Sequence, residues 1–145
     1  MKIELPAHAA AVLDRLQSCG YEAWAVGGCV RDSLLGRVPQ DWDVTTAATP
    51  EETGRCFADH RVIETGIAHG TVTVLSQGLP VEVTTFRVDG DYSDRRHPDS
   101  VAFTRSLHKD LARRDFTVNA MAYREPDGLR DDFGGRGDLE RGLIR

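Results

Sequence analysis

The sequence predicts a single α+β domain in which a mixed β-sheet is flanked by helices. Near the N-terminus, leucines recur at helical spacing among alanines, and further along two segments rich in β-branched residues flank a short turn. Helical and extended segments alternate elsewhere, and an antiparallel hairpin among helices is typical of an α+β domain. The 145 residues suffice for one domain with a buried core, and no repeat or linker divides them.

The N-terminal part alternates helices with strands. Gly20 suits the C-terminal end of a first helix. Thr49 precedes a proline and is followed three residues later by Glu52, a pattern that predicts a capped helix start. We expect helices over 6–18, 30–35 and 50–58, and strands over 21–26 and 42–46.

The rest of the chain predicts a hairpin followed by helices. Two strands, 71–75 and 81–86, are separated by a turn that contains Gly78, so they should pair antiparallel. Residues 89–100 include few apolar side chains and predict a surface loop. We further expect helices over 106–114 and 117–123, a turn at 127–128 and a loop over 131–135.

Composition limits the cellular setting and the partners. With 40% hydrophobic and 28% charged residues, the chain is typical of a soluble globular protein. No apolar run approaches the roughly 20 residues of a membrane helix, and no signal pattern opens the chain. The net charge of −5 argues against this domain wrapping nucleic acid by itself. Cys19, Cys29 and Cys56 are widely spaced, which predicts free thiols in a reducing cytoplasm and argues against a zinc site.

Asp41 and Asp43 are the first candidates for chemistry. Alternate side chains of a strand share a face, so these carboxylates should project the same way. Like charges this close repel unless a cation lies between them, and Mg²⁺ prefers carboxylate oxygens. Upstream, Gly27 and Gly28 enter a short helix whose free N–H groups favour a phosphate. In this order the residues indicate nucleotide chemistry, although each motif alone is more often a tight turn or a solvated strand edge.

Glu82 and Arg31 are further candidates, each with an ordinary alternative. Glu82 lies mid-strand and would become a third carboxylate if its hairpin lay beside the strand of Asp43; a solvent-facing side chain is the alternative. Arg31 lies about one helical turn after the glycines, within reach of a bound phosphate. Its alternative role is an ion pair with Asp32 or Asp41.

A charged segment further along combines Arg114, Asp115 and Asn119. Asp115 and Asn119 are four residues apart, hence on one face of a helix. Arginine can hold a triphosphate through two parallel hydrogen bonds, while aspartate and asparagine can bind sugar hydroxyls. A solvated helix face is the alternative.

These motifs, in this order, resemble the head domain of class II tRNA CCA-adding enzymes and bacterial poly(A) polymerases, in the polymerase β-like nucleotidyltransferase superfamily. The resemblance covers nearly everything from Trp24 to the C-terminus. It rests on Gly27-Gly28-x-Val30-Arg31-Asp32, Leu34-Leu35-Gly36-Arg37, Asp41-x-Asp43, Thr65-Gly66, His69-Gly70-Thr71-Val72, Glu82-Val83-Thr84-Thr85-Phe86-Arg87, Arg113-Arg114-Asp115-Phe116-Thr117-x-Asn119-Ala120 and Asp132-Phe133-Gly134-Gly135.

The resemblance implies a role for each candidate residue. Asp41 and Asp43 would ligate two catalytic Mg²⁺ ions, and Glu82 would be the third active-site carboxylate. The segment 132–135 would form a flexible joint to a following domain. The nucleotide would be bound by Gly27, Gly28 and Arg31 at its triphosphate, and by Arg114, Asp115 and Asn119, which also favour ribose.

The resemblance also implies the reaction: transfer of nucleotides from ATP and CTP to the 3′ end of tRNA. One ion would activate the RNA 3′-hydroxyl and the other would stabilise the leaving pyrophosphate. A poly(A) polymerase with the same head and a non-catalytic nucleotide- or RNA-binding module are the alternatives. The neck, body and tail domains of the family lie beyond the head. Residues 1–145 are therefore expected to be a single head domain, weakly active or inactive when isolated, with neither DNA nor membrane as a partner.

Overall fold

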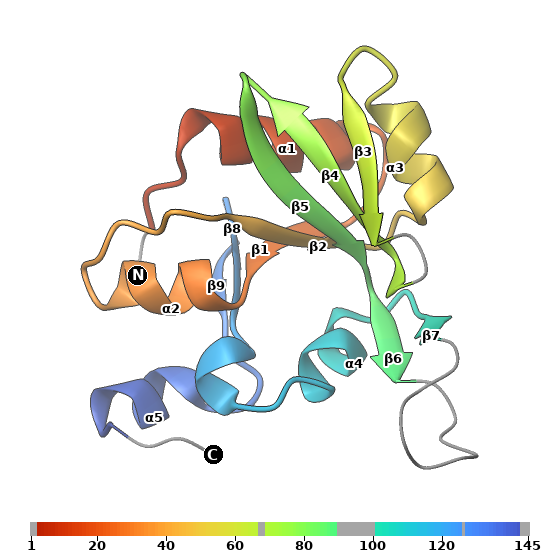
Figure 1. Ribbon diagram of the computed structural model, residues 1–145. Helices are drawn as coiled ribbons and strands as arrows, with labels where there is room; N and C mark the ends of the chain where they lie inside the picture. Colours follow the sequence, from red (N-terminus) through yellow and green to blue (C-terminus); the bar gives the residue numbers. More distant parts are fainter. Residues whose placement is uncertain (1–2, 67–68, 90–100, 126, 143–145) are drawn as a thin grey trace.

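The computed structural model describes residues 3–66, 69–89, 101–125 and 127–142 (Figure 1). In these ranges the chain forms a seven-stranded sheet, a two-stranded sheet and several short helices. The helices are α1 (Ala7–Ser18), α2 (Gly28–Leu34), α3 (Pro50–Cys56), α4 (Leu107–Ala112), α5 (Gly135–Glu140) and the 3₁₀-helix η2 (Thr117–Asn119). The strands are β1 (Ala23–Val26), β2 (Asp43–Thr46), β3 (Val62–Gly66), β4 (Thr71–Ser76), β5 (Leu79–Thr85), β6 (Arg87–Asp89), β7 (Val101–Phe103), β8 (Ala122–Arg124) and β9 (Gly128–Arg130).

The large sheet is mixed, as the sequence predicts. Its strand order is β3-β4-β5-β2-β1-β8-β9; β2 and β5 run parallel, and the other neighbouring strands run antiparallel. β4 and β5 form the predicted hairpin. Because β5 pairs with β2, Asp43 lies directly opposite Glu82, which is distant in the sequence.

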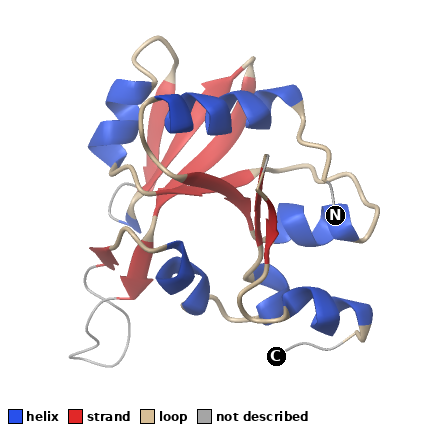
Figure 2. Cartoon of the chain, turned by 180° about the vertical axis from the view of Figure 1, so that it is seen from behind, coloured by secondary structure: helices blue, strands red, loops and turns tan. Residues whose placement is uncertain are grey.

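Helices cover both faces of this sheet. α1 and α3 lie on one side, and α2, α4 and α5 lie on the other (Figure 1 and, from behind, Figure 2). Val44 of β2 and Val83 of β5 pack with Leu13 of α1 in the larger core cluster. Because side chains alternate along a strand, Asp43 and Glu82 project from the opposite face, the side on which α2 and α4 lie.

The N-terminal elements are confirmed. The predicted helices over 6–18, 30–35 and 50–58, the strands over 21–26 and 42–46 and the hairpin strands all form, with ends that differ by at most two residues. Of the predicted loop over 89–100, residue 89 ends β6 and residues 90–100 lie outside the described residues. The strands β3, β6, β7, β8 and β9 were not predicted; all but β3 have only three residues, too few to show a pattern.

The predicted helix over 117–123 is wrong. Only Thr117–Asn119 are helical, as one 3₁₀ turn, and Ala122–Arg124 form strand β8. Ala122 and Tyr123 pair with β1 and are buried, so sheet pairing outweighs the local helix propensity. The turn at Asp127–Gly128 is confirmed, since it joins β8 to β9. The predicted loop is shorter than expected, because α5 begins at Gly135.

Helix α3 begins with the predicted capping box. The Thr49 hydroxyl accepts a hydrogen bond from the backbone N–H of Glu52 at 3.2 Å, and the Glu52 carboxylate accepts one from the backbone N–H of Thr49 at 2.9 Å. We predict that Thr49→Ala lowers the free energy of unfolding by about 1 kcal/mol, measured by urea denaturation. Thr49→Ser keeps the hydroxyl and should lose much less, so equal losses in the two variants would contradict the cap.

Two predictions from composition concern the cysteines and membrane-spanning helices. Cys19 is exposed, Cys56 is half-buried and Cys29 is buried, and all three are free, as predicted. None of the helices in the described ranges has the length and apolar character that crossing a bilayer requires.

Candidate functional site

The centre of the site is the pair of carboxylates on β2 and β5. Asp43 opens β2 and is half-buried, and Glu82 stands beside it on the exposed side of β5. Asp41 lies just before β2 and is exposed. These side chains line one pocket of about 330 Å³, which we call the carboxylate pocket. Its lining residues are Asp41, Trp42, Asp43, Thr73, Pro80 and Glu82.

The electrostatics of Asp43 set it apart from an ordinary surface carboxylate. Burial, repulsion by Glu82 and a hydrogen bond with Glu82 raise the pKa of Asp43 from 3.8 to about 6, and Asp41 adds a smaller repulsion. The guanidinium of Arg114 acts in the opposite direction. The negative charges of Asp43, Glu82 and Asp41 thus exceed the positive charge that Arg114 supplies here. Such an excess is expected where a cation binds.

The donor set fits a hard divalent cation. Carboxylate oxygens are the ligands that Mg²⁺ takes up, and a bound ion would offset the repulsion between Asp43 and Glu82. In the described ranges, no three His, Cys, Asp or Glu side chains are already arranged so that they could hold a metal ion. Asp43 and Glu82 lie opposite each other in the strand register, and Asp41 lines the same pocket.

The predicted glycine turn lies beside two arginines. Gly27 is the N-cap residue of α2 and has φ +82°, a backbone conformation that favours glycine. A Cβ atom at Gly27 would lie 3.7 Å from Nη1 of Arg114, and one at Gly28 would lie 3.2 Å from Nη2 of Arg31. The turn therefore brings bare backbone close to two guanidinium groups, an arrangement that suits an anion.

Arg31 connects this turn to η2. Its Nη1 donates to Oδ1 of Asn119 at 2.8 Å, and its Nε donates to Asp32 at 3.1 Å. The ion pair with Asp32, which the sequence left open as an alternative, is therefore present. It leaves the guanidinium about one-third exposed beside Gly28.

Arg114 lies in a second pocket of about 390 Å³, which we call the arginine pocket. Its side chain is mostly buried, and that burial lowers the pKa of Arg114 from its usual value although Asp110 and Asp43 oppose the shift. Nη2 of Arg114 donates to Asp110 at 3.2 Å, while its buried Nε has no hydrogen-bond partner among the described residues. The lining residues are Arg113, Arg114, Asp115, Phe116 and Asn119.

The structure corrects the predicted helix face of Asp115 and Asn119. α4 ends at Ala112, Asp115 lies in the connecting segment, and Asn119 ends η2. No single helix carries both residues, because the segment turns away to place β8 beside β1. Both nevertheless line the arginine pocket, Asp115 as an exposed residue and Asn119 as a half-buried one.

Asp110 is the residue that sequence reasoning missed. It is fully buried and accepts hydrogen bonds from Thr45, from Arg114 and from the backbone of Arg87. In the sequence it is one acidic residue in a short charged helix, which is usually a solvated face. The signal that could have found it is its spacing: Arg113 and Arg114 follow it at three and four residues.

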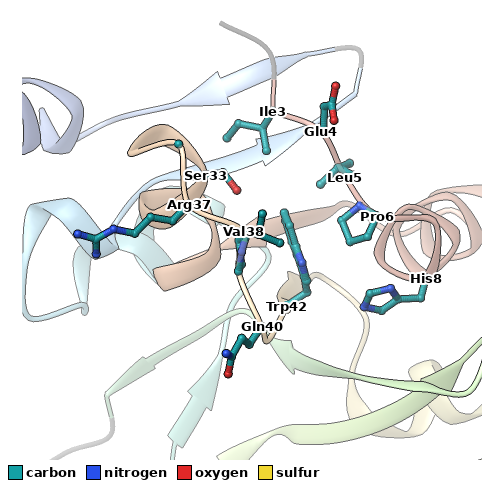
Figure 3. Close-up of a pocket in the computed structure, with 12 residues that line it drawn as sticks. Ile3, Glu4, Leu5, Pro6, His8, Ser33, Arg37, Val38, Gln40 and Trp42 are labelled. Atoms are coloured by element: carbon teal, nitrogen blue, oxygen red, sulfur yellow. The ribbon is translucent and has the colours of Figure 1, made fainter.

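A larger hollow of about 610 Å³ lies beside the site, between the N-terminal segment and the loop after α2 (Figure 3). Trp42 lines both this hollow and the carboxylate pocket. The hollow contains none of the predicted site residues. Its lining mixes apolar side chains with polar ones such as Glu4, His8 and Arg37.

Comparison with known families agrees with this arrangement. Residues 23–145 match the family model described as the Poly A polymerase head domain. The chain belongs to the Poly A polymerase head domain family. The predicted resemblance and the predicted fold class are thereby confirmed for nearly the whole head domain.

Two curated relatives of this chain are named CCA-adding enzymes. The CCA-adding enzyme of Limosilactobacillus fermentum is 50% identical over 100% of this chain and 37% of its own length. That of Geobacillus kaustophilus is 52% identical over 92% of this chain and 32% of its own length. The chain thus spans about a third of the length of these relatives.

Solved structures show the same fold. The CCA-adding enzyme of Bacillus stearothermophilus in complex with CTP matches 95% of this chain and 32% of its own, with a TM-score of 0.84 and 44% identity. The enzyme of Thermotoga maritima complexed with tRNA matches 94% of this chain and 31% of its own, with a TM-score of 0.70 and 28% identity. In both cases the structural similarity is accompanied by sequence identity, so the similarity extends beyond the fold.

Proposed function

We propose that this chain is the catalytic head of a nucleotidyltransferase that adds nucleotides from ATP and CTP to the 3′ end of tRNA. The observation that carries the proposal is the placement of the Asp43–Glu82 carboxylate pair opposite Arg114, in a domain whose relatives are CCA-adding enzymes. The activity belongs to proteins of the relatives' full length, of which this chain spans about a third.

Asp43 and Glu82, with Asp41 at the rim, would hold Mg²⁺. When bound, the ions supply the positive charge that favours ionisation of the RNA 3′-hydroxyl and departure of pyrophosphate. The role of the three carboxylates is to orient that charge at the opening of the pocket.

The residues around the glycine turn would hold the incoming nucleotide. Arg31 and Arg114 lie beside the bare backbone of Gly27 and Gly28, so their guanidinium groups would bind the triphosphate there. Asn119, which accepts a hydrogen bond from Arg31, would lie at the ribose together with Asp115. The protein then contributes mainly positioning and charge, and no covalent enzyme intermediate is required.

A poly(A) polymerase is the second candidate, favoured by the description of the matching family. The two activities are distinguished by their products. We expect the longest natural protein that contains this chain to extend a tRNA lacking its CCA end by a defined three-nucleotide end, with both ATP and CTP required. A long adenosine tail made from ATP alone would contradict this expectation and support the polymerase.

A non-catalytic module is tested on the chain itself. Calorimetric titration with ATP should give binding that strengthens with Mg²⁺ and weakens in Arg114→Ala. Binding that ignores both changes, together with no incorporation by the longer protein, would favour the module.

A further inference from the structure

We propose that Asp110 is a positioning residue, which orients Arg114 between the carboxylate pocket and the triphosphate. The inference deepens the proposed function and rests on it. It assigns no contact between Asp110 and substrate, because the side chain is 0% exposed.

The carboxylate of Asp110 is a junction for four groups. Its Oδ2 accepts hydrogen bonds from Oγ1 of Thr45 at 3.1 Å and from Nη2 of Arg114 at 3.2 Å. Its Oδ1 accepts hydrogen bonds from the backbone N–H of Arg87 at 3.0 Å and from Nε of Arg113 at 3.4 Å. A fully buried carboxylate with this many donors is held in one orientation.

Two of these partners lie on, or just after, the strands that carry the carboxylate pair. Thr45 lies two residues after Asp43 on β2, hence on the same face of the sheet. Arg87 follows β5, the strand of Glu82, after a single residue. Asp110 therefore fixes Arg114 relative to both strands at once, which a bond to either strand alone would not do.

The charges around Arg114 show why this positioning matters. Two negative groups attract its guanidinium: Asp110, which bonds to Nη2, and Asp43 in the carboxylate pocket. Nη1 meanwhile faces the Gly27 turn, where the triphosphate would lie. If Asp110 lost its charge, Asp43 would be the stronger attractor, and Arg114 would turn toward the carboxylate pocket and away from the triphosphate.

The test is the KM for ATP and CTP in nucleotide incorporation by the longest natural protein that contains this chain. Asp110→Asn keeps the shape of the side chain and removes its charge. We expect it to raise the KM about tenfold, the scale of one charge-assisted hydrogen bond, with a much smaller change in kcat. In an Arg114→Ala background the same substitution should add nothing, because Asp110 acts through Arg114.

Two control variants separate positioning from loss of stability. Asp59→Asn makes the same chemical change in a carboxylate that pairs with Arg15, near α1 and α3 on the other side of the sheet, and should leave the KM unchanged. Phe57→Leu creates a small cavity in the core and should lower stability without raising the KM. An Asp110→Asn protein with normal KM, or with an effect that persists in full without Arg114, would overturn the proposal.

A further variant serves if Asp110→Asn does not fold. Arg114→Lys keeps the positive charge but lacks the planar guanidinium, whose separate N–H groups can bond to Asp110 and to a phosphate at the same time. We therefore expect a similar rise in KM. A normal KM in Arg114→Lys would also overturn the proposal. By contrast, an Arg114→Ala protein with unchanged nucleotide KM would refute the triphosphate role of Arg114, and with it that part of the proposed function.

Discussion

Replacing Asp43 by alanine should lower the rate of nucleotide incorporation by at least about 10³-fold, because the pocket loses the buried half of its carboxylate pair. Glu82 and Asp41 would remain, but Glu82 is exposed on β5 and Asp41 lies before β2. Neither occupies the half-buried position at the start of β2 where Asp43 lies. The measurement is single-turnover extension of tRNA at saturating nucleotide and Mg²⁺, with the longest natural protein that contains this chain.

The matched control is Asp127→Ala. Asp127 is exposed in the turn between β8 and β9 and bonds to Arg124, so its loss should leave the incorporation rate within about twofold. If Asp43→Ala retained a tenth or more of the wild-type rate, the metal role of Asp43 would be wrong. A parallel loss in Asp127→Ala would point instead to a general loss of folded protein.

For the carboxylate pair, local sequence patterns predict the strand face of each residue but not the pairing of the two strands. Alternation along a strand places Asp43 on one face of β2 and Glu82 on the face of β5 opposite Val81 and Val83, and both placements are confirmed. That the two strands are neighbours depends on a parallel pairing of segments far apart in the chain. No local pattern encodes such a pairing, and only the family resemblance indicated that Glu82 belongs with Asp43.

The second half of the site was harder to predict for the same reason. Residues 117–123 have a helix-like composition, yet Ala122 and Tyr123 complete the sheet beside β1. Asp110 has the local appearance of a solvated residue and becomes a buried junction only when α4 packs against β2 and β6. Long-range contacts thus decide both features. The metal ligands, the ribose role of Asp115, the joint at 132–135 and the cytoplasmic location stay predictions.

Without metal, Asp43→Asn should raise the free energy of unfolding at pH 7 by about 2 kcal/mol, an estimate for a pKa raised from 3.8 to about 6 in the folded state. The folded protein binds the proton of the Asp43 carboxyl group more tightly than the unfolded chain does. The stabilisation from protonated Asp43 is therefore fully present below about pH 4 and is lost as the pH rises through about 6.

The difference in the free energy of unfolding between Asp43→Asn and wild type should therefore increase with pH, because asparagine carries no charge at any of these pH values. It should be near zero at pH 4, grow between pH 4 and pH 6, and stay constant above that range. Urea denaturation in EDTA at several pH values measures it. Saturating Mg²⁺ should then stabilise the wild-type chain more than the variant, since a ligand that binds only the folded state adds its binding free energy to stability. A variant no more stable than wild type at pH 7 in EDTA would mean that Asp43 carries no uncompensated charge, and that a cation has nothing to relieve there.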